Sequence, residues 1–565
     1  MRVESLNIDE ILYGADPTEG IVAVEPVGPK AMRLFIRRGG RVETRDEPFT
    51  PFILLEDEGA LRDFKPPHRI EPLSGANALR WLALFESWTD CERARDHLRQ
   101  ALGDGGPGAP YLHLSDPVYQ YLLLTGKTLF KGLGYSDLHR MAVDIETTVA
   151  PGFEFSNPQR ESDRIISMAI GDNRGHEEVL FGREMGEREM LETLGERISR
   201  FDPDVIEGHN FFNFDLTYIL ARAKLHGVRL GWGRNGSPPR VRSSRFAVAE
   251  RTIDYNRFDL FGRHVVDTYF LLQYYDVAAR ELESYGLKAA ARHFGLARED
   301  RTYVEHKDIA ASFDADPEAL KRYNLDDVRE TLALSELLGY SFFLQARIFP
   351  FSYQNILVRG NATKINGLFL REYLRRRVSI PKPTAGETFE GGYTDVFSQG
   401  VVENVLHCDV ASLYPSILLS YGIKPSGDVL DIFLPLLKNL KAFRLDAKRR
   451  AKESSAQHER DYYSALQGTF KVLINSFYGY LGTALHHFSD PRAASETARI
   501  GRDIIHRMID WLKEEGAVPL EVDTDGIYFV PPPAVQSPRE AEALVHRLTE
   551  SLPEGIAVEL AGRYR

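Results

Sequence analysis

The sequence predicts a multidomain protein that combines α/β and α+β units. Its 565 residues exceed what one hydrophobic core usually serves, so several domains are expected. Apolar and charged residues make up 43% and 27% of the chain, as in ordinary soluble globular proteins. From residue 141 onward, apolar strand-like runs alternate with helix-like segments, which is typical of α/β domains.

Residues 1–135 predict an N-terminal domain of short strands and one charged helix. β-like runs such as PFILLE at 51–56 precede the helical segment WTDCERARDHLRQAL at 88–102. The Gly-rich stretch at 101–110 then interrupts the pattern. We expect residues 340–388 to pack back on this N-terminal domain.

An α/β domain is predicted over residues 136–339. The strand-like runs MAVDIETT, RIISMAIG and DVIEGHN alternate with helix-like segments such as LTYILARAKLHG. The Gly, Ser, Pro and Arg residues of 232–246 indicate a loop or hairpin excursion within this domain.

The last part of the chain predicts a strand that turns into a helix, followed by a helix pair. The strand begins at residue 405 in VLHCDVASLYPSILLSYG. Residues 435–480 contain few Gly or Pro residues and predict two long helices, joined near 453–457.

Composition argues against a secreted or membrane-spanning protein. Cys91 and Cys408 lie far apart and fit neither a disulfide framework nor a zinc ligand set. The N-terminal segment MRVESLNIDE has acidic residues where a signal peptide has its apolar core, and no apolar run reaches membrane-spanning length. A cytoplasmic location without a membrane partner is expected.

The charge of the chain gives two opposing indications about nucleic acid. A formal net charge of −12 argues against it, because proteins that neutralise phosphates usually show a basic surface. Basic residues nevertheless dominate between Lys438 and Lys471. That stretch fits either a solvated helix face or the place where an anionic partner binds.

A first group of acidic residues occurs on a predicted strand and two predicted helices. Asp144 and Glu146 alternate with apolar residues, so on a strand both carboxylates face the same way. Asp215 follows in GHNFFNFDL, and Tyr323 and Asp327 are spaced to share one helix face. Such oxygen ligands suit Mg²⁺ or Mn²⁺, and two ions together can clamp the attacking and leaving oxygens of a phosphodiester. Taken singly, the patterns also fit a solvated strand edge or a capped helix start.

A second group combines a strand aspartate with basic helical residues. Asp409 ends the apolar run VLHCDV, after which the chain turns and leaves backbone N–H groups free to hold phosphate oxygens. Lys and Arg side chains on facing helices can grip a triphosphate. The residues at helical spacing are Arg444 and Lys448 on the first helix, and Lys471, Asn475, Tyr478 and Gly479 on the second.

A third acidic motif, EVDTDGIYFV at 521–530, contains Asp523 and Asp525. Alone it reads as a hairpin, since Asp-Gly between β-rich runs is a strong turn signal. A calcium loop is excluded, because Glu521 and Pro532 stand where that loop needs its first Asp and last Glu. The remaining interpretation is a divalent-metal site with Asp409 as partner.

These motifs, taken in order, resemble those of a known enzyme family. D-x-E, N-x-x-x-F-D and Y-x-x-x-D resemble the three motifs of the DnaQ-like 3′–5′ exonucleases of the DEDDy type. D-x-x-S-L-Y-P-S, K-x-x-x-N-S-x-Y-G and D-T-D resemble motifs A, B and C of the family B DNA polymerases, here of prokaryotic type. FEGGY at 389–393 is similar to the family's linker, with Phe389 in place of the usual Tyr.

For the exonuclease, the resemblance implies that the carboxylates hold two metal ions and that a tyrosine orients the attacking water. The implied metal ligands are Asp144, Glu146, Asp215 and Asp327, and the tyrosine is Tyr323. Asn210 and Phe214 would line the site for the single-stranded primer end, where a phenylalanine ring can stack on an unpaired base.

For the polymerase, the resemblance implies in-line attack of the primer 3′-oxygen on an incoming dNTP, assisted by two Mg²⁺ ions, with Mn²⁺ as an alternative. The implied metal ligands are Asp409, Asp525 and the Val410 carbonyl, supported by Asp523. The implied nucleotide contacts are Ser412, Leu413, Tyr414, Arg444, Lys448, Lys471, Asn475 and Tyr478, with Tyr414 excluding a 2′-hydroxyl. The implied DNA contacts are Gly391, Gly392, Tyr393 and Gly479.

The implied fold is an RNase H-like exonuclease domain at 136–339, plus a right-hand polymerase palm and helical fingers. The palm is divided between 389–434, with motif A, and 481–565, with motif C. The fingers are the helices of 435–480, with motif B.

A helical thumb, which grips the primer–template duplex in this family, is expected to be absent because the chain stops at ELAGRYR. The chain is then either one piece of a split polymerase completed by a second chain or a truncated record. The sequence does not explain the role of Glu521, which replaces the usual Tyr of motif C.

The implied function is a DNA-directed DNA polymerase with proofreading, nucleoid-associated and able to bind primer–template DNA, dNTPs and a sliding clamp. Two alternatives stay open. One is a 3′–5′ exonuclease whose polymerase activity is lost without the thumb, and the other is a non-catalytic replication scaffold.

Overall fold

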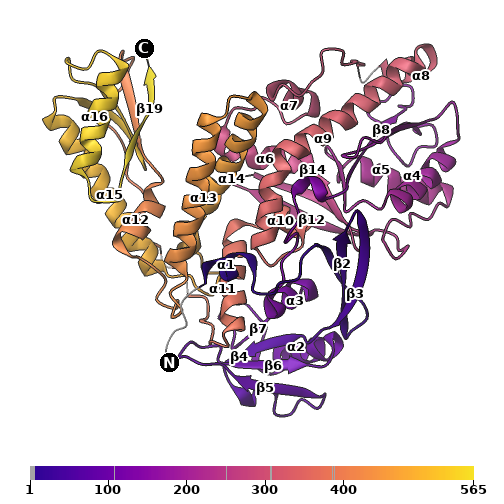
Figure 1. Cartoon of the computed structure of the whole chain (residues 1–565), viewed down its shortest axis with the longest axis horizontal. Helices are drawn as coiled ribbons and strands as arrows, with labels where there is room; N and C mark the ends of the chain where they lie inside the picture. The colour runs from indigo at the N-terminus through magenta and orange to yellow at the C-terminus, as the bar shows by residue number, and fades with distance from the viewer. Residues whose placement is uncertain are drawn as a thin grey trace.

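Five β-sheets are packed around long helices in the part of the chain that the structure describes (Figure 1). The structure is a computed structural model that describes residues 7–564, apart from 107, 250, 306–307, 385, 387 and the side chain of 278. Across this described part, no helix combines the length and apolar character that a membrane crossing needs.

The N-terminal region contains two antiparallel sheets, which share a core with helices from much later in the chain. The first sheet comprises β1 (Ile21–Pro26), β2 (Ala31–Arg38) and β3 (Arg41–Pro48). The second has the order β5-β6-β4-β7, with β4 (Phe52–Leu55), β5 (His68–Pro72), β6 (Trp81–Phe85) and β7 (Tyr111–His113). The helices are α1 (Ile8–Tyr13), α2 (Trp88–Leu102) and α3 (Pro117–Thr125).

Residues that follow position 352 return to this N-terminal region. α10 (Tyr353–Val358) is followed by α11 (Asn361–Arg375), which packs against α3. Beyond α11, Ile380 exchanges backbone hydrogen bonds with Leu79, at 2.9 and 3.0 Å. The chain therefore passes through the N-terminal region twice before it reaches the C-terminal sheet.

The central sheet has the order β10-β9-β8-β11-β14 and confirms the strands predicted after residue 141. Its strands are β8 (Arg140–Thr147), β9 (Ile165–Asp172), β10 (Glu177–Phe181), β11 (Val205–Gly208) and β14 (His264–Asp267). β8 and β9 pair antiparallel, whereas β11 pairs parallel with both β8 and β14. The excursion predicted at 232–246 is a hairpin of β12 (Arg240–Val248) and β13 (Arg251–Asp259).

Helices cover both faces of the central sheet. α4 (Glu187–Phe201) and α5 (Asp215–His226) pack together, and α9 (Pro317–Ile348) runs across β8 and β9. The start of α9 is fixed by Asp316, whose carboxylate accepts from the Ala319 N–H, and by Pro317 in the first turn. The shorter helices are α6 (Thr268–Ala279), α7 (Leu287–His293) and α8 (Ile309–Ala315).

The C-terminal sheet is antiparallel and has the order β15-β17-β18-β16-β19. Its strands are β15 (Thr394–Val396), β16 (Val405–Val410), β17 (Val518–Asp523), β18 (Gly526–Val530) and β19 (Val558–Tyr564). Apolar side chains of the sheet form one core with those of three helices, α12 (Leu413–Tyr421), α15 (Pro491–Glu514) and α16 (Pro538–Ser551).

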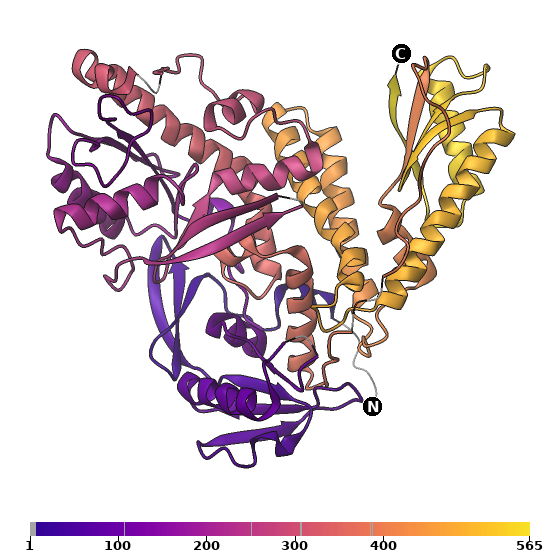
Figure 2. The same cartoon turned by 180° about the vertical axis from the view of Figure 1, so that it is seen from behind.

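The predicted helix pair consists of α13 (Phe433–Glu453) and α14 (Gln457–Gly482), with the junction at the predicted place. α13 starts two residues earlier than predicted, because Pro435 lies in the first turn, where a missing N–H costs no intrahelical hydrogen bond. Figure 2 shows the pair between the central sheet and the C-terminal sheet. α14 packs against α9, where the rings of Tyr340 and Tyr462 are 4.8 Å apart.

Candidate active sites

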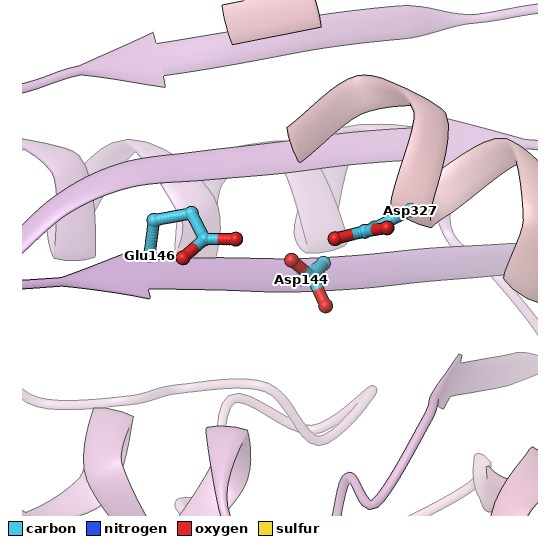
Figure 3. A group of neighbouring side chains, drawn as sticks. All are labelled: Asp144, Glu146 and Asp327. Atoms are coloured by element: carbon cyan, nitrogen blue, oxygen red, sulfur yellow. The ribbon is translucent and has the colours of Figure 1, made fainter. Parts of the chain in front are cut away.

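Three carboxylates from β8 and α9 converge over the central sheet (Figure 3). Asp144 and Glu146 are alternate residues of β8 and lie on one face, as predicted, and Asp327 approaches from α9. Each of the three offers an oxygen, and these oxygens all lie within 4.8 Å of one another. Oxygen ligands at this spacing suit a hard divalent cation.

Asp215, the first residue of α5, lies beside this cluster and is buried. Its carboxylate accepts a hydrogen bond of 3.1 Å from the Ile145 N–H, which lies between the two acidic residues of β8. Repulsion from Asp144 reaches it and, after burial, is the second cause that raises its pKa. The structure therefore brings the predicted fourth carboxylate to the same strand.

Burial raises the pKa of every carboxylate in this group, and repulsion within the group adds to it for Asp144, Glu146 and Asp215. Burial is the main cause for Asp144, Glu146 and Asp215. The pKa of Asp327 is raised to about 6 by burial, against the opposing attraction of Lys288 and Arg301. Ionising all four groups at neutral pH is costly without added positive charge, which a divalent cation would supply.

Two cations that sequence reasoning missed hold the tyrosine and aspartate of α9. Lys288, on α7, donates a hydrogen bond to the Tyr323 hydroxyl, and its Nζ lies 3.7 Å from Asp327 Oδ2. Arg301 is 1% exposed and pairs with Asp327 and, at 2.8 Å, with Glu330. No spacing rule links either cation to α9, because Lys288 lies on α7 and Arg301 lies in the irregular chain between α7 and α8.

A third missed residue is Asn324, which follows the predicted tyrosine directly. Its side-chain amide donates to Asp144 Oδ2 at 2.6 Å, and its carbonyl oxygen accepts from Ser167 at 2.7 Å. Its place in YNLDD, between Tyr323 and Asp327, was the only signal in the sequence. It holds one metal-ligand candidate in place.

The two predicted single-strand contacts lie between β11 and α5. Asn210 is exposed and adopts a left-handed backbone conformation, φ 56°, which asparagine tolerates better than most residues. Phe214 immediately precedes α5 and is half-buried, with its ring 5.7 Å from that of Tyr218.

A second acidic site lies at the ends of β16, β17 and β18, where Asp409 and Asp525 meet. Asp409 pairs with Gly526 across the sheet, and the Val410 N–H donates to the Asp525 carbonyl at 2.8 Å. Burial, then repulsion from Asp409, raises the pKa of Asp525 to about 6. Thr524, in the predicted turn, has a left-handed backbone conformation with φ 57°. The turn brings Asp525 next to Asp409.

Asp523 and Glu521 lie on β17, beside this pair. Asp523 pairs with Gly526 at the end of the β17–β18 hairpin, and its negative charge contributes to the raised pKa of Asp525. Glu521 is exposed and pairs with Tyr528 across the hairpin and with Val396 on its other side.

Basic residues of the helix pair line a cavity of about 350 Å³ next to the C-terminal sheet. Arg444, Lys448 and Lys471 all border it, as predicted for a triphosphate site. Glu559 of β19, which sequence reasoning missed, accepts from Lys448 at 2.8 Å and pairs with Asp409 across the sheet. It has no sequence motif and becomes visible only through strand pairing.

The predicted nucleotide contacts after Asp409 begin at Ser412, which contacts Arg444 of this cavity. Ser412 has a left-handed backbone, φ 53°, and its hydroxyl accepts from Arg444 at 2.8 Å, while Leu413 begins α12. The rings of Tyr414 and Tyr478 stack, with centroids 3.8 Å apart and planes inclined by 16°. On α14, Asn475 and Gly479 are exposed.

The FEGGY linker passes directly over the second acidic site. The carbonyl of Gly391 accepts from Arg502 at 2.7 Å, and that of Tyr393 accepts from the Thr524 N–H at 2.9 Å. A side chain at Gly392 would stand 2.7 Å from Thr524 Cγ2 and 3.1 Å from the Tyr414 hydroxyl. Only glycine fits there without displacing one of them.

Comparison with known proteins agrees with this geometry. Residues 171–290 match the family model for "DNA polymerase family B, exonuclease domain", and residues 430–528 match that for "DNA polymerase family B". The chain is 26% identical to DNA polymerase 1 of Pyrococcus abyssi and 25% to the DNA polymerase of Thermococcus gorgonarius. Each alignment spans 603 residues, 95% of this chain and 74% of the relative.

A solved structure supports the same fold. The family B DNA polymerase of the hyperthermophilic archaeon Pyrobaculum calidifontis superposes with a TM-score of 0.72 and 21% identity, covering 98% of this chain and 78% of that one. The matched family models and the named relatives identify this chain as a DNA-directed DNA polymerase that carries a 3′–5′ exonuclease domain. In both matched segments the chain is similar to family B DNA polymerases.

Proposed function

We propose that the chain adds dNTPs to a primer 3′ end at the C-terminal sheet and proofreads the product at the central sheet. The observation that carries the proposal is the convergence of Asp144, Glu146 and Asp327 over the central sheet, together with Asp409 beside Asp525 in the C-terminal sheet. Each group is buried or half-buried, with raised carboxyl pKa values that cationic ligands would offset.

Divalent metal, with Mg²⁺ first and Mn²⁺ as the alternative, fits both groups because every donor is an oxygen. When bound, two ions per site stabilise the charge that develops on the attacking and leaving oxygens. In the exonuclease the proposed ligands are Asp144, Glu146, Asp215 and Asp327. In the polymerase they are Asp409, Asp525 and the Val410 carbonyl, with Asp523 as a supporting charge.

In the proposed exonuclease, Tyr323 orients the attacking water from its position four residues before Asp327 on α9. Asn210 and Phe214 hold the single-stranded primer end at the start of α5. A ring at that place stacks on any base, which suits proofreading, since a mismatched end of any sequence must be accepted.

In the proposed polymerase, cations of the helix pair bind the triphosphate and the linker follows the DNA. Arg444, Lys448 and Lys471 neutralise the phosphates, and the turn at Ser412 and Leu413 offers backbone N–H groups. The ring of Tyr414 excludes a ribose 2′-hydroxyl by contact. Asn475 and Tyr478 pack on the nascent base pair, and Gly391, Gly392, Tyr393 and Gly479 contact DNA.

The domain division that we propose follows the predicted boundaries. Residues 1–135 with 340–388 form the N-terminal domain, and 136–339 form the exonuclease. The palm comprises 389–434 and 481–565, and the fingers 435–480. We further propose primer–template DNA as substrate in the cytoplasm, with a sliding clamp as partner.

A primer–template assay with Mg²⁺ and dNTPs tests both activities in one tube. Asp409→Asn is expected to abolish extension and keep digestion, whereas Asp144→Asn does the reverse, because each change removes one ligand of one site. Asp503→Asn, an exposed change on α15, is the matched control. Each reaction is run with and without a thumb-bearing segment. Persistent extension by Asp409→Asn would contradict the proposed polymerase site.

A further inference from the structure

Lys441 is a half-buried cation of the helix pair that no sequence motif indicated. It lies on α13, three residues before Arg444, and α13 packs against α12 (Figure 1). Its Nζ donates to the Ser416 hydroxyl at 2.9 Å. Burial, then repulsion from Arg444, lowers its pKa, and no carboxylate of the described residues raises it. A half-buried ammonium group with a cationic neighbour and no anionic partner is costly to keep.

Arg444, the second cation, is also incompletely paired. It is 7% exposed, and its guanidinium donates to the Ser412 hydroxyl at 2.8 Å. Its Nε has no hydrogen-bond partner in the part of the chain that the structure describes. Arg444 borders the cavity beside the C-terminal sheet. Because buried polar groups are normally satisfied, a buried guanidinium nitrogen without an acceptor indicates that an anionic ligand binds at this cavity.

The turn between β16 and α12 is held from two sides. On the sheet side, the Ala411 N–H donates to the Ala557 carbonyl at 2.8 Å. On the helix side, the Ser416 hydroxyl donates to the Ala411 carbonyl at 2.9 Å. An ammonium group has N–H donors and no acceptor, so Ser416 accepts from Lys441 and keeps its own proton for Ala411. Lys441 therefore sets the direction of the hydroxyl that holds the turn.

The first N–H groups of α12 have no partners within the helix, as at every helix start, so a fixed turn presents them to a phosphate group. We propose that Lys441 is a positioning residue of the polymerase site. Through Ser416 it fixes the turn at 411–413, so that the turn and Arg444 meet the triphosphate of the incoming nucleotide. The proposal rests on the polymerase function proposed above. Lys441 is not among the residues that border the cavity, so it acts without touching the phosphates.

A double-mutant cycle on the full chain tests this role. Lys441→Met, Ser416→Ala and the double variant are compared with the unaltered chain, and Lys441→Arg tests rescue by a different cationic donor. Lys438→Ala, an exposed change on the same helix, is the control. Steady-state single-nucleotide extension of a primer–template with Mg²⁺ gives kcat and the KM for the dNTP. Thermal melting of each variant checks the fold.

Lys441→Met is expected to raise the KM for the dNTP about tenfold and to change kcat less than about threefold, because the turn binds the phosphates alike in the ground and transition states. Removing the half-buried charge should leave the melting temperature equal or higher, which loss of a merely structural residue would not do. In the Ser416→Ala background the same change should alter the KM less than about twofold, because the hydroxyl is already gone. Lys441→Arg should reverse most of the increase.

Equal increases of the KM in both backgrounds would overturn the positioning role, since Lys441 would then act without Ser416. A lowered melting temperature, or a loss confined to kcat, would also overturn it. Normal extension with an unchanged KM in Lys441→Met would overturn this inference alone. An unaltered chain that adds no nucleotide would overturn the proposed polymerase and this inference with it.

Discussion

Asp525→Asn should stabilise the metal-free chain while abolishing nucleotide addition. The half-buried Asp525 carboxyl lies beside Asp409, and its pKa rises from 3.8 to about 6. A folded-state pKa above the unfolded-state value means that ionisation opposes folding. The stabilising contribution of the protonated group is therefore complete below about pH 4 and is lost as pH rises through about 6.

The size of the effect follows from the shift. About two pKa units correspond to about 3 kcal/mol, and partial solvent access reduces this to about 1–2 kcal/mol. Removing the charge should then raise the melting temperature of the C-terminal region by about 3–6 °C at pH 7.5. At pH 4, where Asp525 is protonated anyway, the two proteins should melt together.

The assay is differential scanning calorimetry in EDTA at pH 4, 5.5 and 7.5, with primer extension in Mg²⁺ as the functional measurement. Asp503→Asn on α15 serves as control, since its carboxylate is exposed and already pairs with Arg499. A stability difference that stays constant with pH, or that shrinks as pH rises, would refute the raised pKa of Asp525 that burial and the neighbouring Asp409 produce.

Two further changes test residues that support each site. Arg301→Met should lower the free energy of unfolding of the region around the central sheet by about 3–5 kcal/mol, because it leaves Asp327 buried without its partner. Chemical denaturation measures this, and the exposed change Arg298→Met should leave the free energy of unfolding unaltered. Gly392→Ala should slow primer extension by about tenfold and leave digestion unchanged, since the added methyl group displaces Thr524 over the polymerase site. Equal rates for the variant and the unaltered chain in a single-nucleotide extension assay would contradict the close contact between residue 392 and Thr524.

The parts of the sites that follow regular spacing could be predicted from the sequence. Alternation placed Asp144 and Glu146 on one face of β8, and helical spacing placed Tyr323 and Asp327 together on α9. The break between α13 and α14 was visible because Ser454 and its polar neighbours end the apolar periodicity. These are local rules, and the structure obeys them.

The charged partners of these residues could not be predicted in the same way. Lys288 and Arg301 reach α9 from earlier chain without periodic spacing, and Glu559 meets Lys448 only because β19 pairs with β16. Long-range pairing depends on how whole elements pack, and no window of sequence contains that information. The sequence therefore indicated the carboxylates but not the side chains that balance their charge.

The packing of α14 against α9 connects the helix pair beside the C-terminal sheet with the helix that carries part of the carboxylate cluster. Lys471 of α14 lines the cavity beside the C-terminal sheet, and Tyr462 of the same helix touches Tyr340 of α9, the helix that bears Tyr323. Packed helices move by sliding as rigid rods, with little deformation. We therefore expect that a tilt of α14 would also shift α9, and with it Tyr323 and Asp327 at the carboxylate cluster of the central sheet.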